Sequence, residues 1–243
     1  METQTDRRTE WFVPRWGPLK FRLLAGLLFL PYTGMVLSFT VIGAMLADFI
    51  HWDRVAALLL IYFLGLGIAA HALDALGSKK IKPWGEHFSR GKLWTLAAAS
   101  LVIAYLIAIY YMVRYVPLLW VFAVLEGFFV FAYNLEWFKG KFHTDEWFAF
   151  SWGMLPLLAG YVMQTNRISG AAVILAVAAG LLSYVEINAS RPYKALKRNS
   201  RETDGTGADL SAEHLARYEK ILKSISLGVI LLGLGLMVFR AAG

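Results

Sequence analysis

Residues 55–76 read VAALLLIYFLGLGIAAHALDAL, an apolar run that ends in a histidine and an aspartate. An apolar run of about 20 residues is long enough to cross the roughly 30 Å hydrocarbon core of a bilayer as an α-helix. Hydrophobic residues make up 58% of the 243-residue chain and charged residues only 17%, which is too apolar for an ordinary soluble domain. The sequence therefore predicts an integral membrane protein.

Seven runs of this kind follow one another along the chain. They predict an all-α, multi-pass transmembrane helical bundle that forms a single membrane domain over residues 1–243. A polar tail at about 1–20 precedes the first span, and a polar loop at about 190–215 precedes the last. Pro31 lies inside the first span and is expected to kink it. The expected spans are 21–47, 55–76, 93–113, 115–136, 147–165, 168–188 and 221–239.

The basic residues predict the orientation of the bundle. All but four of the 24 lysines and arginines lie in the N-terminal tail or in the connections after the second, fourth and sixth expected spans. By the positive-inside rule this side is cytoplasmic, so the N-terminus is expected in the cytoplasm and the C-terminus on the opposite side. The same one-sided distribution argues against nucleic acid as the partner behind the net charge of +7. The four exceptions are Arg54, Arg114, Arg167 and Arg240.

Polar side chains gather at the cytoplasmic ends of the even-numbered spans. Span two ends with His71 and Asp74, span four with Tyr133, and span six with Glu186 followed by Arg191. The expected topology brings these ends to the same membrane face. The chain has no cysteine, which excludes disulfides, thiolate metal sites and cysteine nucleophiles. Any chemistry is therefore expected from carboxylates and basic groups at this face.

A basic rim around carboxylates at a membrane surface suits an amphiphile with an anionic head and an apolar tail. Carboxylates hold Mg²⁺ on diphosphate oxygens, and lysine and arginine side chains neutralise the remaining charge. A carboxyl inside a membrane span is costly and functional by default, which applies most strongly to Glu126, about midway along span four. Glu126 lies two helical turns before Tyr133 and is expected to share its helix face.

This layout resembles the UbiA superfamily of intramembrane prenyltransferases. In that family an Asp-rich motif ends helix two, a Tyr-x-x-x-Lys-like segment follows helix four, and a second Asp-rich motif ends helix six. Asp74 matches the first motif, and KPWGEHFS, which begins at Lys82, is similar to the family's R-P-x-x-x-G-x-I-S run. YNLEWFKGK matches the middle segment at Tyr133, with Lys139 two positions late, and Glu186 occupies the third station.

The resemblance implies an enzyme that moves a prenyl group from a prenyl diphosphate to a lipophilic or aromatic acceptor. It implies that Asp74 and Glu186 hold Mg²⁺ and act in catalysis. The substrate-binding residues expected are His71, Lys82, Glu126, Tyr133, Lys139, Asn188, Arg191 and Lys194. A terpene cyclase, in which the double bonds of the prenyl chain itself capture the cation, is a close variant.

The chain also departs from the family. The positions four residues before and after Asp74 and Glu186 carry neither Asp nor Asn, so each acidic motif is reduced to one carboxylate. Relatives usually have nine spans rather than seven, so a second copy, another subunit or membrane lipid would close the helix ring. These departures favour a second hypothesis, a catalytically degenerate relative that binds lipid or supports a complex. A transporter is a distant third, because no internal repeat is visible.

Each of these residues also has a purely structural interpretation. His71 and Asp74 would cap a helix end, and Glu126 would be a protonated or paired structural carboxyl. The lysines and arginines would serve only to set the topology. Residues 143–146, HTDE, are best interpreted as a helix start with Thr144 as its cap.

Overall fold

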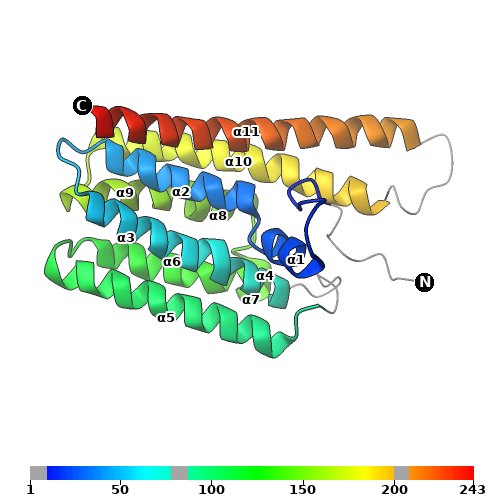
Figure 1. The fold of residues 1–243 in the computed structure, drawn as a ribbon, viewed down its shortest axis with the longest axis horizontal. Coiled ribbons are helices and arrows are strands. Elements are labelled where there is room, and N and C mark those ends of the chain that lie inside the picture. Colours follow the sequence, from blue (N-terminus) through cyan, green and yellow to red (C-terminus); the bar gives the residue numbers. More distant parts are fainter. Residues whose placement is uncertain (1–9, 78–86, 200–207) are drawn as a thin grey trace.

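The computed structural model describes residues 10–77, 87–199 and 208–243, and every regular element in these ranges is a helix. Figure 1 shows the long helices side by side along the longest axis of the molecule. Helices α10 (Gly170–Asn199) and α11 (Ala208–Ala242) run along one edge, and α5 (Arg90–Arg114) runs along the other. The all-α class predicted from the sequence is confirmed.

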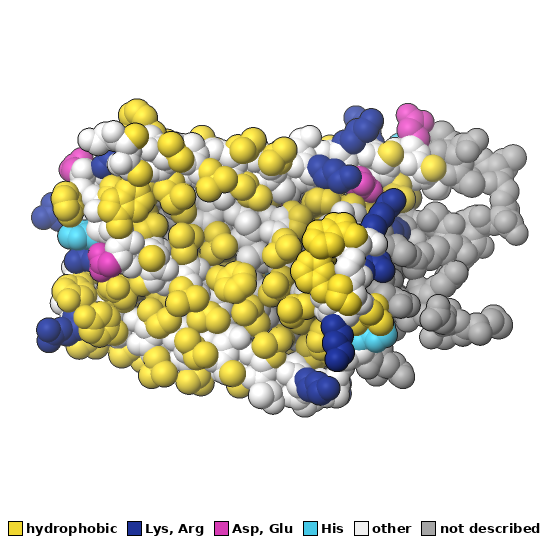
Figure 2. All heavy atoms as spheres, viewed as in Figure 1, with side chains coloured by type: hydrophobic (Ala, Val, Ile, Leu, Met, Phe, Trp, Pro, Cys, Tyr) yellow, Lys and Arg dark blue, Asp and Glu magenta, His cyan; other side chains and the backbone are white. Residues whose placement is uncertain are grey.

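Several helices have the length and composition of membrane spans. Among the described residues, four helices meet both requirements, and the bent pair α1 (Leu19–Leu27) and α2 (Leu30–Met45) would make a fifth if it forms one span. Figure 2 shows hydrophobic side chains over the middle of the visible face and charged side chains at both ends. This pattern is typical of a protein inserted in a bilayer. The four helices are Trp52–Gly77, Arg90–Arg114, Gly170–Lys197 and Ser211–Ala242.

The expected kink in the first span is present. Helices α1 and α2 meet at 43°, and the break lies at Phe29, whose φ of 43° is left-handed. Pro31 follows in the first turn of α2, where a residue without an amide hydrogen loses no helical hydrogen bond. The chain therefore breaks just before the proline.

The second span is one helix with a widened middle. It begins as α3 (Trp52–Tyr62), continues as the π-helical segment η2 (Phe63–Ala70) and ends as α4 (His71–Gly77). In a π-helix each amide bonds to the carbonyl five residues earlier, and such segments are frequent at functional sites. The segment ends directly before the histidine of the expected site.

The fourth and fifth expected spans are built from shorter elements. Helix α6 (Leu119–Asn134) is apolar but shorter than the four long helices. A short turn of helix, α7 (Trp137–Gly140), leads to α8 (Asp145–Ala149), a second π-helical segment η3 (Phe150–Met154) and α9 (Leu155–Thr165). The total of seven spans stays a prediction.

The expected helix start in HTDE is confirmed. The Thr144 hydroxyl accepts a hydrogen bond from the Trp147 amide at 3.4 Å, which caps α8. Hydrogen bonding to Thr144 and to the backbone lowers the pKa of Glu146 in the first turn. A carboxylate is favourable there because the first amides of a helix are unpaired.

The polar tail expected at about 1–20 has a buried part. Phe12 and Val13 are buried, and the Phe12 ring stacks on Phe29 with 4.6 Å between ring centroids. Glu10 forms an ion pair with Lys197 of α10, with 3.4 Å between Oε2 and Nζ. The apolar side chains of this segment pack on the bundle, so residues 10–13 contribute to its core.

The polar loop expected at about 190–215 is shorter than predicted. Helix α10 continues past Pro192 to Asn199, and α11 already begins at Ala208. The extension is rich in alanine, leucine, lysine and arginine, which are strong helix formers. The pair Glu219 and Lys223, four residues apart on α11, is 2.6 Å apart and supports the helix beyond the apolar region.

Close contact between α2 and α9 organises the middle of the bundle. A Cβ atom at Gly43 would collide with the Leu157 carbonyl, and one at Gly160 would collide with the Thr40 carbonyl. Glycines at both positions let the two backbones approach, as is common between membrane helices. Helix α11 packs on the same helix α2, where Gly233 lies against Ser38.

Candidate functional site

The expected site residues lie mainly at one end of the bundle. Figure 1 shows α1, α4 and α7 gathered at this end, away from the C-terminus. The last turns of α6 and the second half of α10 supply further polar side chains. Two clusters can be distinguished, one around Tyr133 and one around Glu186.

The first cluster surrounds the buried side chain of Tyr133 at the end of α6. Its ring stacks on His143 with 4.5 Å between centroids, and His143 Nδ1 lies 2.9 Å from the Tyr133 carbonyl oxygen. Arg191 of α10 donates from Nη2 to the His143 carbonyl at 3.2 Å, and its Nε lies 2.7 Å from Asp145 Oδ1. The end of α4 packs closely on the end of α6, because a Cβ atom at Gly77 would collide with the Asn134 carbonyl. Side chains from three distant segments therefore meet here.

The second cluster surrounds Glu186 on α10. This side chain is 2% exposed, and within the described ranges its Oε1 has no hydrogen-bond partner. The charge of Lys194, two helical turns further on, acts on the carboxyl. Lys194 Nζ lies 5.6 Å from the centre of the Phe29 ring and 5.9 Å from that of Tyr32. Glu186 is thus a buried carboxyl with a basic group nearby.

A column of buried rings joins the two clusters. Phe29 stacks on His71 at 4.7 Å, and His71 lies 5.3 Å from Trp152 of η3. Trp152 stacks on Phe148 at 5.3 Å, and Phe148 lies 5.8 Å from Tyr133. The rings fill the interior between α2, α4, α6 and the α8–η3 segment. Because the rings stack on one another and are buried, the column holds this end of the bundle together.

The structure brings together some of the predicted site residues and separates others. Asp74, Tyr133 and Arg191 belong to the first cluster, and Glu186 and Lys194 form the second. His71 lies inside the ring column, with its Nε2 3.4 Å from Thr33 Oγ1. Two of the remaining four are exposed: Lys139, which follows α6, and Asn188, which donates a hydrogen bond to the Tyr184 carbonyl. Glu126 lies in another part of the bundle, and Lys82 lies outside the described residues.

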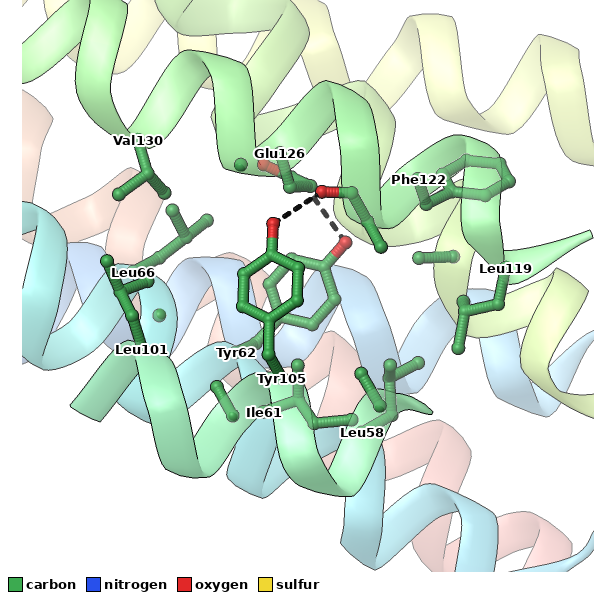
Figure 3. A pocket seen from close by; sticks show the side chains of 16 residues that line it. Leu58, Ile61, Tyr62, Leu66, Leu101, Tyr105, Leu119, Phe122, Glu126 and Val130 are labelled. Atoms are coloured by element: carbon green, nitrogen blue, oxygen red, sulfur yellow. Dashed lines mark hydrogen bonds between the residues drawn. The ribbon is translucent and has the colours of Figure 1, made fainter. Parts of the chain in front are cut away.

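Glu126 and Tyr133 contact different parts of the bundle, although they share a helix face by spacing. The Tyr62 hydroxyl of α3 donates a hydrogen bond to Glu126 Oε1 at 3.0 Å, in a pocket shown in Figure 3. Tyr133 instead packs on His143 and Phe148. Glu126 therefore does not join the polar clusters.

Sequence reasoning missed three contributors to this site. His143 and Asp145 lie in the segment interpreted as a helix start, and Trp152 carries no distinct signal of its own. The available signal was position, because His143 and Asp145 follow Tyr133 in a connection on the same expected membrane face. Asp145 serves both purposes, since it begins α8 and also pairs with Arg191.

The described residues offer a limited site for magnesium. They contain no group of three His, Asp or Glu side chains placed to hold one metal ion. Asp74 and Glu186 also have different neighbours, Tyr133 for the first and Lys194 for the second. Mg²⁺ often keeps several waters and is held by one or two carboxylates together with substrate phosphates. These residues fit an ion of that kind, and magnesium stays a prediction.

Comparison with protein-family models, with curated proteins and with solved structures gave no match. The likeness to the UbiA superfamily therefore rests on the motifs and on their order along the chain.

Proposed function

We propose that this protein is a UbiA-like intramembrane prenyltransferase that acts on a prenyl diphosphate. The observation that carries the proposal is that the ends of α4 and α6 and the second half of α10 come together. Gly77 of α4 lies against the Asn134 carbonyl of α6, and Arg191 of α10 bonds to the carbonyl of His143, whose ring stacks on Tyr133. These three segments are the stations at which the family places its polar motifs. A purely structural bundle has no need for an arginine and an aspartate from two other helices beside one buried tyrosine.

The chemistry proposed follows from the charges at this end. Arg191 and Lys194 would neutralise the diphosphate, and Asp74 and Glu186, one at each cluster, are the carboxylates available to magnesium that arrives with it. The bond between the prenyl carbon and the diphosphate oxygen breaks, and the diphosphate keeps the electron pair. The allylic cation forms a bond to the acceptor, whose proton passes to the diphosphate.

A second candidate is a non-catalytic lipid-binding or structural membrane protein of the same design. Two observations favour it. The ring column fills the interior where a prenyl chain would lie, and within the described ranges no three-residue metal site is present. In this case a second copy or a partner subunit would complete the helix ring.

Binding of geranyl diphosphate to the purified protein in detergent micelles separates the two candidates. The enzyme proposal expects binding that requires Mg²⁺ and that is lost in Asp74→Asn. Glu213→Gln, which removes a carboxylate from an exposed position on α11, is the matched control and should bind as the unmodified protein does. Binding that is absent, or indifferent to both magnesium and Asp74, would leave the non-catalytic candidate.

A further inference from the structure

A pocket of about 70 Å³ lies between the second span, α5 and α6, about two helical turns along α6 from Tyr133. Its lining is almost entirely apolar, with Leu66, Leu101 and Phe122 among the labelled side chains in Figure 3. The polar side chains of the lining are Glu126, Tyr62 and Tyr105. This pocket is separate from both polar clusters described above.

One polar atom in the pocket is left without a partner. The Tyr62 hydroxyl donates to Glu126 Oε1 at 3.0 Å, and the Tyr105 hydroxyl donates to the Ala123 carbonyl at 2.7 Å (Figure 3). Glu126 Oε2 is buried and, in the part of the chain that the structure describes, accepts or donates no hydrogen bond. A buried polar atom without a partner is costly, so a ligand that supplies one gains binding energy.

The pocket is only partly enclosed, and its lining residues Leu101, Tyr105 and Ala123 are half-buried at the apolar surface of the bundle. Apolar residues next to them along α5 and α6 are exposed, Val102 by 58%, Leu106 by 65% and Val124 by 67%. Apolar side chains exposed along the middle of such helices face lipid in a membrane. A molecule dissolved in the bilayer therefore has direct access.

We propose that this pocket binds a lipid alcohol, a mainly hydrocarbon molecule whose single hydroxyl bonds to Glu126 Oε2. A hydroxyl both donates and accepts, so it matches this oxygen whether the carboxyl is ionised or protonated. The volume is smaller than the ~150 Å³ cavity known to hold benzene, so only the hydroxyl end enters and the remaining chain extends into the bilayer. The inference is independent of the proposed diphosphate site, because it concerns other residues and an uncharged ligand.

Gly65 of η2 provides a variant that fills the pocket. A Cβ atom at this lining position would meet no atom within 4 Å, so Gly65→Leu places a side chain in the open space. Gly228 of α11 is equally open but lies outside the pocket, and Gly228→Leu is the matched control. Glu126→Leu removes the unpaired oxygen, whereas Glu126→Gln keeps an amide that can both donate and accept.

The experiment uses a photoreactive long-chain primary alcohol with a diazirine beside the hydroxyl, added to the protein in nanodiscs. Labelled peptides are located by mass spectrometry, and hexadecanol and hexadecane serve as competitors. We expect labelling within α5 and α6 that hexadecanol suppresses and hexadecane does not. Labelling should fall about tenfold in Gly65→Leu, because the site is blocked, and in Glu126→Leu, because one hydrogen bond is lost. In Gly228→Leu and Glu126→Gln it should stay within about twofold of the unmodified protein.

Either of two results would overturn the proposal. Equal competition by hexadecane would mean that the hydroxyl is not recognised. Labelling that is unchanged in Gly65→Leu would mean that the alcohol does not bind in this pocket. Should Gly65→Leu fail to fold, Gly65→Ala replaces it, with an expected decrease of about threefold. Loss of alcohol labelling with intact geranyl diphosphate binding would reject this inference alone, and the reverse result would reject only the proposed function.

Discussion

Arg191 Nε lies 2.7 Å from Asp145 Oδ1, and this ion pair connects the second half of α10 with the first turn of α8. The side chains are 41% and 22% exposed, so water screens part of the attraction. The same guanidinium donates a hydrogen bond to the His143 carbonyl, and its positive charge influences the Tyr133 hydroxyl electrostatically. One arginine therefore holds three segments of the candidate site.

The ion pair should contribute modestly to stability. We expect a coupling free energy of about 0.5–1 kcal/mol between Arg191→Gln and Asp145→Asn, the range for partly exposed pairs. Thermal unfolding of the two single variants and the double variant in detergent measures it. If the stability changes of the two single variants add up to that of the double variant, the ion pair contributes no coupling free energy.

Tyr133→Phe should show how much the hydroxyl of this residue contributes to ligand binding, apart from its ring. The variant keeps the stacking on His143 but removes the hydroxyl beside the segment to which Arg191 bonds. Geranyl diphosphate binding should weaken about tenfold, the size of one charge-assisted hydrogen bond, because Arg191 loses a group that positions it. Titration calorimetry measures the change, and unaltered affinity would remove Tyr133 from the site.

Glu186→Gln should raise stability and lower ligand binding. Burial of a carboxyl whose Oε1 has no hydrogen-bond partner in the described ranges is unfavourable, and a neutral amide of the same shape reduces that cost by about 1 kcal/mol. The apparent melting temperature should therefore increase while magnesium-dependent geranyl diphosphate binding falls. The exposed variant Glu213→Gln should change neither quantity. A lower melting temperature in Glu186→Gln would indicate that the carboxylate is structurally required.

Gly43→Ala should destabilise the bundle strongly. Its added methyl group collides with the Leu157 carbonyl, a backbone atom that cannot rotate away, so α2 and α9 must separate. We expect a loss of about 2 kcal/mol or more in the free energy of unfolding, as for overpacked interiors. Gly228→Ala, whose methyl meets open space, is the control and should be neutral or slightly stabilising. Equal melting temperatures for the two variants would contradict the close packing.

The orientation can be tested with single cysteines, because the chain has none of its own. Lys141 and Arg167 are both exposed, the first just after α7 and the second just after α9. If the basic end is cytoplasmic, Arg167→Cys reacts with a membrane-impermeant maleimide added to intact cells, and Lys141→Cys reacts only after lysis. The opposite pattern would invert the topology.

The sequence predicted those features that depend on composition and on single strong signals. The apolar runs gave the helices, Pro31 marked the kink in the first span, and Thr144 marked the start of α8. Asp74, Tyr133 and Arg191 were expected to meet because topology alone brings their helix ends together. These inferences need only local patterns and a membrane.

Other features depend on packing that no local pattern reports. The π-helical segments FLGLGIAA and FSWGM have no distinct periodicity, yet each carries or precedes a residue of the ring column. Helical spacing placed Glu126 and Tyr133 on one face, but different neighbouring helices cover the two levels of α6. Likewise, spacing alone did not indicate that Glu186 would lie buried beside Lys194 rather than beside Asp74.

The ion pair between Glu10 and Lys197 has a consequence for biosynthesis. The two residues are 187 positions apart, so a ribosome adding ~5–20 residues per second needs about 10–40 s to synthesise the second after the first. During that interval the segment that carries Phe12 has no α10 to dock on, while the first apolar helices are already available for insertion. Residues 10–13 are therefore among the last parts of the described protein to reach their final position.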